Sequence, residues 1–126
     1  MNVKIPRLYS GDDGKSHWGE LEVELKDMKG WAVPGTGRTD DIPATAIRFR
    51  LAPPGTDTGW VNAPARQFVF TITGEVEYEI DDGKPPRRFG PGGIFLAEDF
   101  TGKGHISRGI GPGTRLSAYV HAPKVK

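Results

Sequence analysis

The stretch "GKGHISR" at residues 102–108 carries His105, one of three histidines in a chain of 126 residues. An imidazole changes charge near neutral pH, so it suits a general acid or base, and its neutral form binds metal ions. Glu98, Asp99 and Lys103 lie close to it in the sequence. A carboxylate among them could fix the tautomer of the imidazole. The same residues also fit an ordinary surface turn, with His105 in a structural role.

Several other side chains have chemistry suited to a small ligand. Asn62 and Gln67 can donate and accept hydrogen bonds to position it, and Arg48 can clamp a carboxylate or phosphate. Aromatic rings can form an apolar wall, and the candidates are Trp60, Phe70 and Phe95. Each residue also fits a plain structural role: the amides within strands, the rings as packing, and the guanidinium on a solvated face.

The composition narrows the class of protein. A chain of this length suits one compact domain, and 17 basic against 16 acidic residues give a net charge of +1. That balance argues against a basic surface for nucleic acid or an anionic membrane. The lack of cysteine excludes thiolate zinc sites and thiol nucleophiles. The N-terminus has no apolar signal core and no apolar run is long enough to span a membrane, so we expect a cytoplasmic protein.

Period-two alternation identifies the elements that must position these side chains. The alternation is clearest at residues 19–25, 45–51 and 75–80, and frequent glycine and proline separate these from further short strands at 66–73, 93–99, 105–111 and 114–122. Many short strands with turns between them are typical of a sandwich or barrel. We predict a single all-β domain over 1–126, with a strand and loop arm at 1–43 and a barrel core at 44–122.

The two faces of the strand at 66–73 differ in character. Phe68, Phe70 and Ile72 lie on one face, and Gln67 lies on the other with Val69, Thr71 and Thr73. If the polar side lines a cavity, the aromatic side faces outward, together with Ile47, Phe49 and Leu51 of the strand at 45–51. An outward apolar face of this size predicts a homodimer. The alternative is that residues 1–43 wrap across the sheet and cover this face.

The order of strands and glycines over residues 45–120 resembles that of the small single-domain (RmlC-like) cupins. Their first motif, G-x5-H-x-H-x3,4-E-x6-G, aligns with Gly55, Gln67 and Gly74, but its histidine positions hold Val61 and Ala63 in one register. The other register places Trp60 and Asn62 there. In the second motif, G-x5-P-x-G-x2-H-x3-N, Gly102 and His105 match, while Phe100 and Gly109 replace proline and asparagine. The resemblance implies a jelly-roll barrel, or double-stranded β-helix, with its site in the barrel interior.

The degenerate motifs shape the predicted function. The family's metal site implies three histidines and a carboxylate, and this chain retains only His105 with a neutral glutamine, so we expect no metal or other cofactor. The first hypothesis is a metal-independent enzyme of isomerase, cyclase or lyase type, with His105 as acid/base. The second is a barrel that binds or senses a small molecule without chemistry. The third is a metal-dependent cupin in which His105 works with an unusual ligand set.

Overall fold

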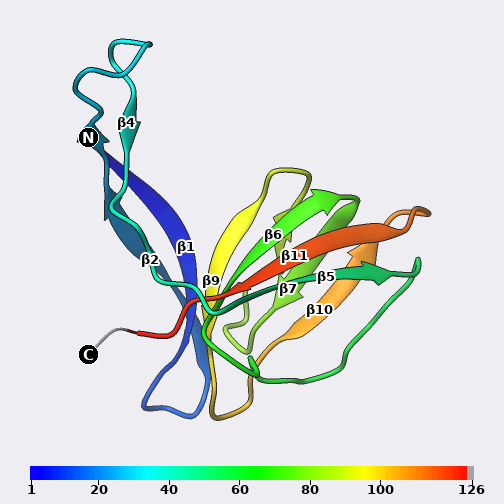
Figure 1. Cartoon of the computed structure of the whole chain (residues 1–126). Helices are drawn as coiled ribbons and strands as arrows, with labels where there is room; N and C mark the ends of the chain where they lie inside the picture. The colour runs from blue at the N-terminus through cyan, green and yellow to red at the C-terminus, as the bar shows by residue number, and fades with distance from the viewer. Residues whose placement is uncertain (125–126) are drawn as a thin grey trace.

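The structure is a computed structural model that describes residues 1–124, and it is all-β (Figure 1). The strands are β1 (Asn2–Ser10), β2 (Ser16–Glu24), β3 (Lys26–Asp27), β4 (Gly37–Arg38), β5 (Ala46–Ala52), β6 (Gln67–Thr73), β7 (Glu75–Glu79), β8 (Arg87–Phe89), β9 (Ile94–Glu98), β10 (Ile106–Ile110) and β11 (Arg115–His121). Within the described residues no helix is long and apolar enough to cross a membrane.

The strands form two main sheets with the core between them. The larger sheet has the order β2-β1-β9-β6-β11-β5, and the smaller has the order β10-β7-β8. One buried cluster draws Val69, Phe95 and Tyr119 from the larger sheet and Val76 and Tyr78 from the smaller, so the two sheets pack face to face. Strands β3 and β4 pair separately, on the long loop that extends from the barrel beyond the β1–β2 hairpin (Figure 1).

Aromatic rings fill part of the space between the sheets. The ring centroids of Tyr78 and Phe95 lie 4.7 Å apart, and those of Phe89 and Phe95 lie 5.3 Å apart. Trp18 of β2 packs edge-on against Phe95 at 5.5 Å. Strict alternation in β7 directs Val76 and Tyr78 inward, where both are buried. Aromatic pairs in these geometries stabilise the core beyond the area that they bury.

The outer face of the larger sheet is also apolar. Phe68 pairs with Leu96 across β6 and β9, and both are buried in a second cluster that includes Phe70. Residues 39–44 approach this cluster, because Ile42 and Ala44 line the same surface hollow as Phe68 and Phe70. The arm therefore covers part of this face, against β6 and β9, while the apolar side chains of the edge strand β5 stay exposed.

The N-terminal region contains more strand than its sequence predicted. Strands β1 and β2 form an antiparallel ladder from Asn2↔Glu24 to Ser10↔Ser16, and β1 also pairs in parallel with β9. Only the second of these two strands was identified from the sequence. The alternation in β1 is interrupted at Pro6 and Arg7, and a proline within such a run weakens the strand signal. The predicted strands from residue 45 onward are confirmed, with boundaries that differ by at most one residue.

Candidate functional site

A cavity of about 300 Å³ lies between the two sheets. Its walls come from β5, β6, β7, β9 and β11, from the connection between β5 and β6, and from His105 and Ser107 at the start of β10. That connection runs antiparallel along β10, with Val61 opposite His105 and Asp57 opposite Arg108. A segment without regular strand structure therefore closes the open edge of the smaller sheet and brings Asn62 to the cavity.

Backbone geometry places His105 in the cavity wall. The amide of Val61 donates to the carbonyl of His105, and the amide of His105 donates to the carbonyl of Val61, each at 2.8 Å. Gly104 precedes it with φ +78°, and a Cβ there would lie 2.0 Å from the carbonyl oxygen of Val61. Only glycine fits such a close approach in this backbone conformation. The side chain of His105 is 11% exposed and lines the cavity, so it faces the interior of the barrel.

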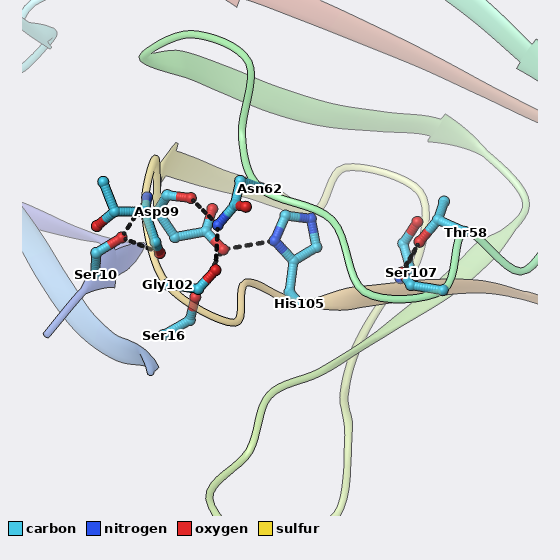
Figure 2. Close-up of polar contacts among 10 residues, drawn as sticks. Ser10, Ser16, Thr58, Asn62, Asp99, Gly102, His105 and Ser107 are labelled. Carbon is cyan, nitrogen blue, oxygen red and sulfur yellow. Dashed lines mark hydrogen bonds and ion pairs between the residues drawn. The ribbon is translucent and has the colours of Figure 1, made fainter. Parts of the chain in front are cut away.

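A buried carboxylate orients the imidazole. The Nδ1 atom of His105 lies 2.6 Å from Oδ2 of Asp99, and the hydroxyl of Ser16 donates to the same oxygen at 2.8 Å. Figure 2 shows the Asp99 carboxylate facing the ring of His105. Asp99 is fully buried, and as a carboxylate it can only accept, which assigns the proton of a neutral imidazole to Nδ1. The lone pair on Nε2 then remains for a ligand, which is the arrangement of a base and its orienting group.

Side-chain bonds hold the turn after β9 in place. The Nδ2 group of Asn62 donates to the carbonyls of Asp99 and Gly102, each at 3.2 Å. The hydroxyl of Ser10 donates to the carbonyl of Thr101 at 3.0 Å (Figure 2). The connection between β5 and β6 and the end of β1 therefore both secure the turn that carries Asp99.

The neighbouring Glu98 points the opposite way. It lies on the outer face of β9 and pairs with Arg66, from Nε to Oε2 at 2.9 Å, and with Arg7. Burial raises the pKa of Glu98, but hydrogen bonds from Arg7 and Arg66 outweigh burial and hold it below its ordinary value. Glu98 thus links β1, β9 and the segment before β6, whereas Asp99 orients the imidazole of His105 in the cavity wall.

Two tyrosines, Tyr78 and Tyr119, line the cavity. Burial raises the pKa of Tyr78 to about 12, and Tyr119 adds to the rise while Arg115 and Arg50 oppose it. The Tyr78 phenol is therefore neutral at physiological pH and able to donate a hydrogen bond. Its ring centroid lies 5.9 Å from that of His105. The guanidinium of Arg50 donates to the hydroxyl of Tyr119 and lies over its ring, 4.6 Å from the centroid.

Most of the residues predicted from the sequence meet in this cavity. Its lining includes the predicted residues His105, Asn62, Gln67, Phe95 and Arg48. Arg48 is exposed, as expected of a solvated face, and it also lines the open cavity because the apolar residues of β5 face the other way.

Two predicted binding residues lie elsewhere. Phe70 faces the outer side of the larger sheet and packs in the cluster around Phe68, because Gln67 and Val69 occupy the cavity side of β6 and alternation directs Phe70 away. Trp60 is 40% exposed, and the ammonium of Lys103 lies over its ring, 4.3 Å from the centroid. Neither side chain lines the cavity, so we withdraw both as ligand contacts.

Sequence reasoning missed several site residues. Tyr78 and Tyr119 alternate inward on their strands, and that signal was present in the sequence. Ser16 carried no such signal, because only the tertiary fold brings the start of β2 to Asp99. Asp99 was considered as an orienting group, but its sequence context favoured a surface turn.

The side chains at the predicted metal positions do not fit the family's ion. Residues 1–124 contain no group of three or more histidine, aspartate or glutamate side chains arranged to hold a metal. The positions that match the family's ligands hold one imidazole and the neutral amide of Gln67, and Nδ1 of His105 is already bonded to Asp99. A neutral amide oxygen and a single imidazole are a poor donor set for a transition metal. We therefore derive no chemical step through a metal.

Comparison with solved structures identifies the fold. The chain resembles the cupin domain of Cnp3 from Schizosaccharomyces pombe, with a TM-score of 0.53 and 13% sequence identity, over 98% of this chain and 84% of that one. No protein-family model and no curated protein sequence matches the chain. The likeness confirms the cupin-type jelly-roll fold that the sequence motifs predicted. A fold of this kind hosts many functions, so the function depends on the side chains in the cavity.

Proposed function

We propose that the chain is an acid/base enzyme that moves a proton on a small organic molecule bound inside the barrel. The observation that supports it is the chain of contacts from Ser16 through Asp99 to His105, which ends in the cavity. A buried carboxylate that accepts from Nδ1 stabilises the imidazolium that forms when Nε2 takes a proton. Asp99 is the orienting group and His105 is the base.

Tyr78 is the complementary proton donor in this proposal. With a pKa of about 12 its hydroxyl stays neutral, so it can donate a hydrogen bond to an oxygen on which negative charge develops. In the proton transfer, Nε2 of His105 takes a proton from a carbon beside a carbonyl group. The C–H electron pair forms a carbon–carbon double bond and the carbonyl electrons move to oxygen, giving an enolate. Return of the proton to either carbon face, or to a neighbouring atom, completes an isomerisation.

The test uses hydrogen exchange in place of an unknown overall reaction. The chain is incubated in D₂O with a panel of small carbonyl compounds, and NMR follows loss of the proton beside the carbonyl. His105→Gln should lower the exchange rate by roughly 10²–10⁴-fold, the usual contribution of a general base. Asp99→Asn should also lower it, because the amide can donate to Nδ1 and favour the wrong tautomer. His17→Gln is a matched control, since His17 forms an exposed pair with Asp13 at 2.9 Å.

Two results would turn the assignment toward a binding module. The first is exchange that is no faster than in buffer for every compound in the panel. The second is a ligand that co-purifies with the chain and binds His105→Gln within about tenfold of the native affinity, as the loss of one hydrogen bond would allow. A catalytic base requires a rate effect that is specific to the cavity histidine and absent for His17.

We also propose that two copies of the chain pair through the outer face of the larger sheet. Ile47, Phe49 and Leu51 on the edge strand β5 are 62%, 61% and 65% exposed. They lie opposite Val120, Ala118 and Leu116 of β11, so the apolar surface continues inward across the sheet. Contiguous apolar patches of this kind usually mark interfaces, and a symmetric dimer is the commonest closed assembly.

A further inference from the structure

The cavity wall carries positive charge without acidic side chains to balance it. Arg48 and Arg50 line the cavity, and among residues 1–124 no aspartate or glutamate does. Asp99 is fully buried beside His105 and bonded to its Nδ1 atom, so it does not face the bound molecule. Clefts lined by one sign of charge concentrate ligands of the opposite sign.

The alternation of β5 places both arginines on the cavity side. The register with β11 sets Arg48 opposite Tyr119 and Arg50 opposite Ser117. Arg50 is held by its hydrogen bond and cation–π contact with Tyr119, whereas Arg48 makes no ion pair with any residue in 1–124. Residues two apart on a strand lie about 6–7 Å apart along it, so two guanidinium groups can reach one anionic group.

A third arginine lies buried on the same inner face. Arg115 of β11 is 3% exposed, and its Nε and Nη1 atoms have no hydrogen-bond partner among the described residues. It lies close enough to Tyr78 to lower the pKa of that phenol against the larger effect of burial. Buried donor atoms without a hydrogen-bond partner cost free energy, and the charge of Arg115 adds to the attraction of the adjoining cavity for an anion.

We infer that the ligand of this cavity is a small organic acid whose carboxylate is bound by Arg48 and Arg50. This inference rests on the proposed function and adds the substrate class to it. A guanidinium fork matches the planar carboxylate with two parallel hydrogen bonds. The carbon skeleton would lie against Val69, Phe95 and Ala97, and about 300 Å³ suits a small metabolite. The arginines would also favour the negative charge that develops when His105 removes a proton.

The test compares three probes with the full chain: benzoate, the neutral benzamide of similar shape, and inorganic phosphate. Calorimetry or NMR titration should show benzoate binding at least about tenfold more tightly than benzamide, because hydrogen bonds to charged groups contribute that much. Arg48→Gln and Arg50→Gln should each remove most of this preference. Arg88→Gln is the matched control, since its side chain on β8 is 68% exposed and does not line the cavity.

The outcomes separate the inference from its alternatives. Equal binding of benzoate and benzamide by the native chain would overturn it, as would an unchanged preference in Arg48→Gln. Phosphate binding more tightly than benzoate would overturn the carboxylate and assign a phosphorylated ligand. If Arg50→Gln loses its fold with the Tyr119 contact, Arg48→Gln carries the test, because Arg48 has no ion pair to lose among the described residues. His105→Gln should keep the benzoate preference, which supports the anion site even where proton exchange fails.

Discussion

Replacing Tyr78 with phenylalanine should remove an alkaline loss of stability that the native chain shows. Burial raises the pKa of Tyr78 to about 12 from an ordinary value of 10.0. In the unfolded chain the phenol ionises near that ordinary value, so between the two values the unfolded state has lost a proton that the folded state keeps. The stability that Tyr78 contributes is complete below pH 10.0 and falls as the pH rises through this window.

The size of the effect follows from the shift. Inside the window the free energy of unfolding falls by about 1.4 kcal/mol per pH unit. Between about pH 9 and about pH 11 the native chain should therefore lose about 1.4 kcal/mol more than Tyr78→Phe. Urea unfolding at these two pH values measures the difference. Tyr9→Phe, on β1 and outside the cavity, should retain the native loss. Equal losses in the native chain and Tyr78→Phe would refute the buried neutral phenol, and the proposed proton donor with it.

Three further predictions concern the carboxylate beside the site, the tight turn and the outer face. Because folding lowers its pKa, Glu98 stabilises the folded chain at pH values above its ordinary pKa of 4.5, and this contribution is lost as the pH falls through the folded pKa. The difference in free energy of unfolding between the native chain and Glu98→Gln, measured in urea, should therefore shrink on acidification. A constant difference would contradict this. Gly104→Ala should lower the free energy of unfolding in urea more than Gly83→Ala does. Both glycines have positive φ, but only at position 104 would a Cβ lie within 4 Å of other backbone atoms. Equal losses of stability would contradict the close approach at Gly104. Light scattering at tens of micromolar should give twice 13.7 kDa for the native chain and 13.7 kDa for Phe49→Glu, and a native monomer would exclude the dimer.

The sequence predicted the barrel well because its central strands obey a simple rule. One face of each strand packs inward and the other faces the surface, so a period of two is visible in residues 75–80 and 45–51. β1 lacked that signal because Pro6 and Arg7 interrupt it, although the strand pairs along its length with β2. Where a strand is largely buried on both faces, as in β6, alternation identifies the two sides but does not indicate which side lines the cavity.

Only part of the candidate site could be predicted from the sequence, for a reason that differs from the one that hid β1. Motif spacing located His105, and local context suggested a nearby carboxylate, but the burial of Asp99 depends on segments far away in the sequence. Ser16 approaches it from 83 residues earlier in the chain, and the backbone of Ala63 donates to its carbonyl. The amino-acid sequence of residues 98–105 contains no pattern that indicates these contacts. Trp60 was misplaced similarly, since its exposure follows from how the connection between β5 and β6 lies along β10.

The N-terminal hairpin therefore belongs to the site as well as to the sheet. The start of β2 supplies Ser16 to Asp99, and in the turn the carbonyl of Gly14 accepts from the amide of Lys103 at 2.9 Å. Gly102 packs so closely on that turn that a Cβ would lie 2.5 Å from the same carbonyl oxygen. The loop that presents His105 is thus held on one side by the turn between β1 and β2, and on the other by the strand-like pairing of Val61. A boundary near residue 44 separates the arm from the barrel in sequence, but the orientation of the proposed base depends on both.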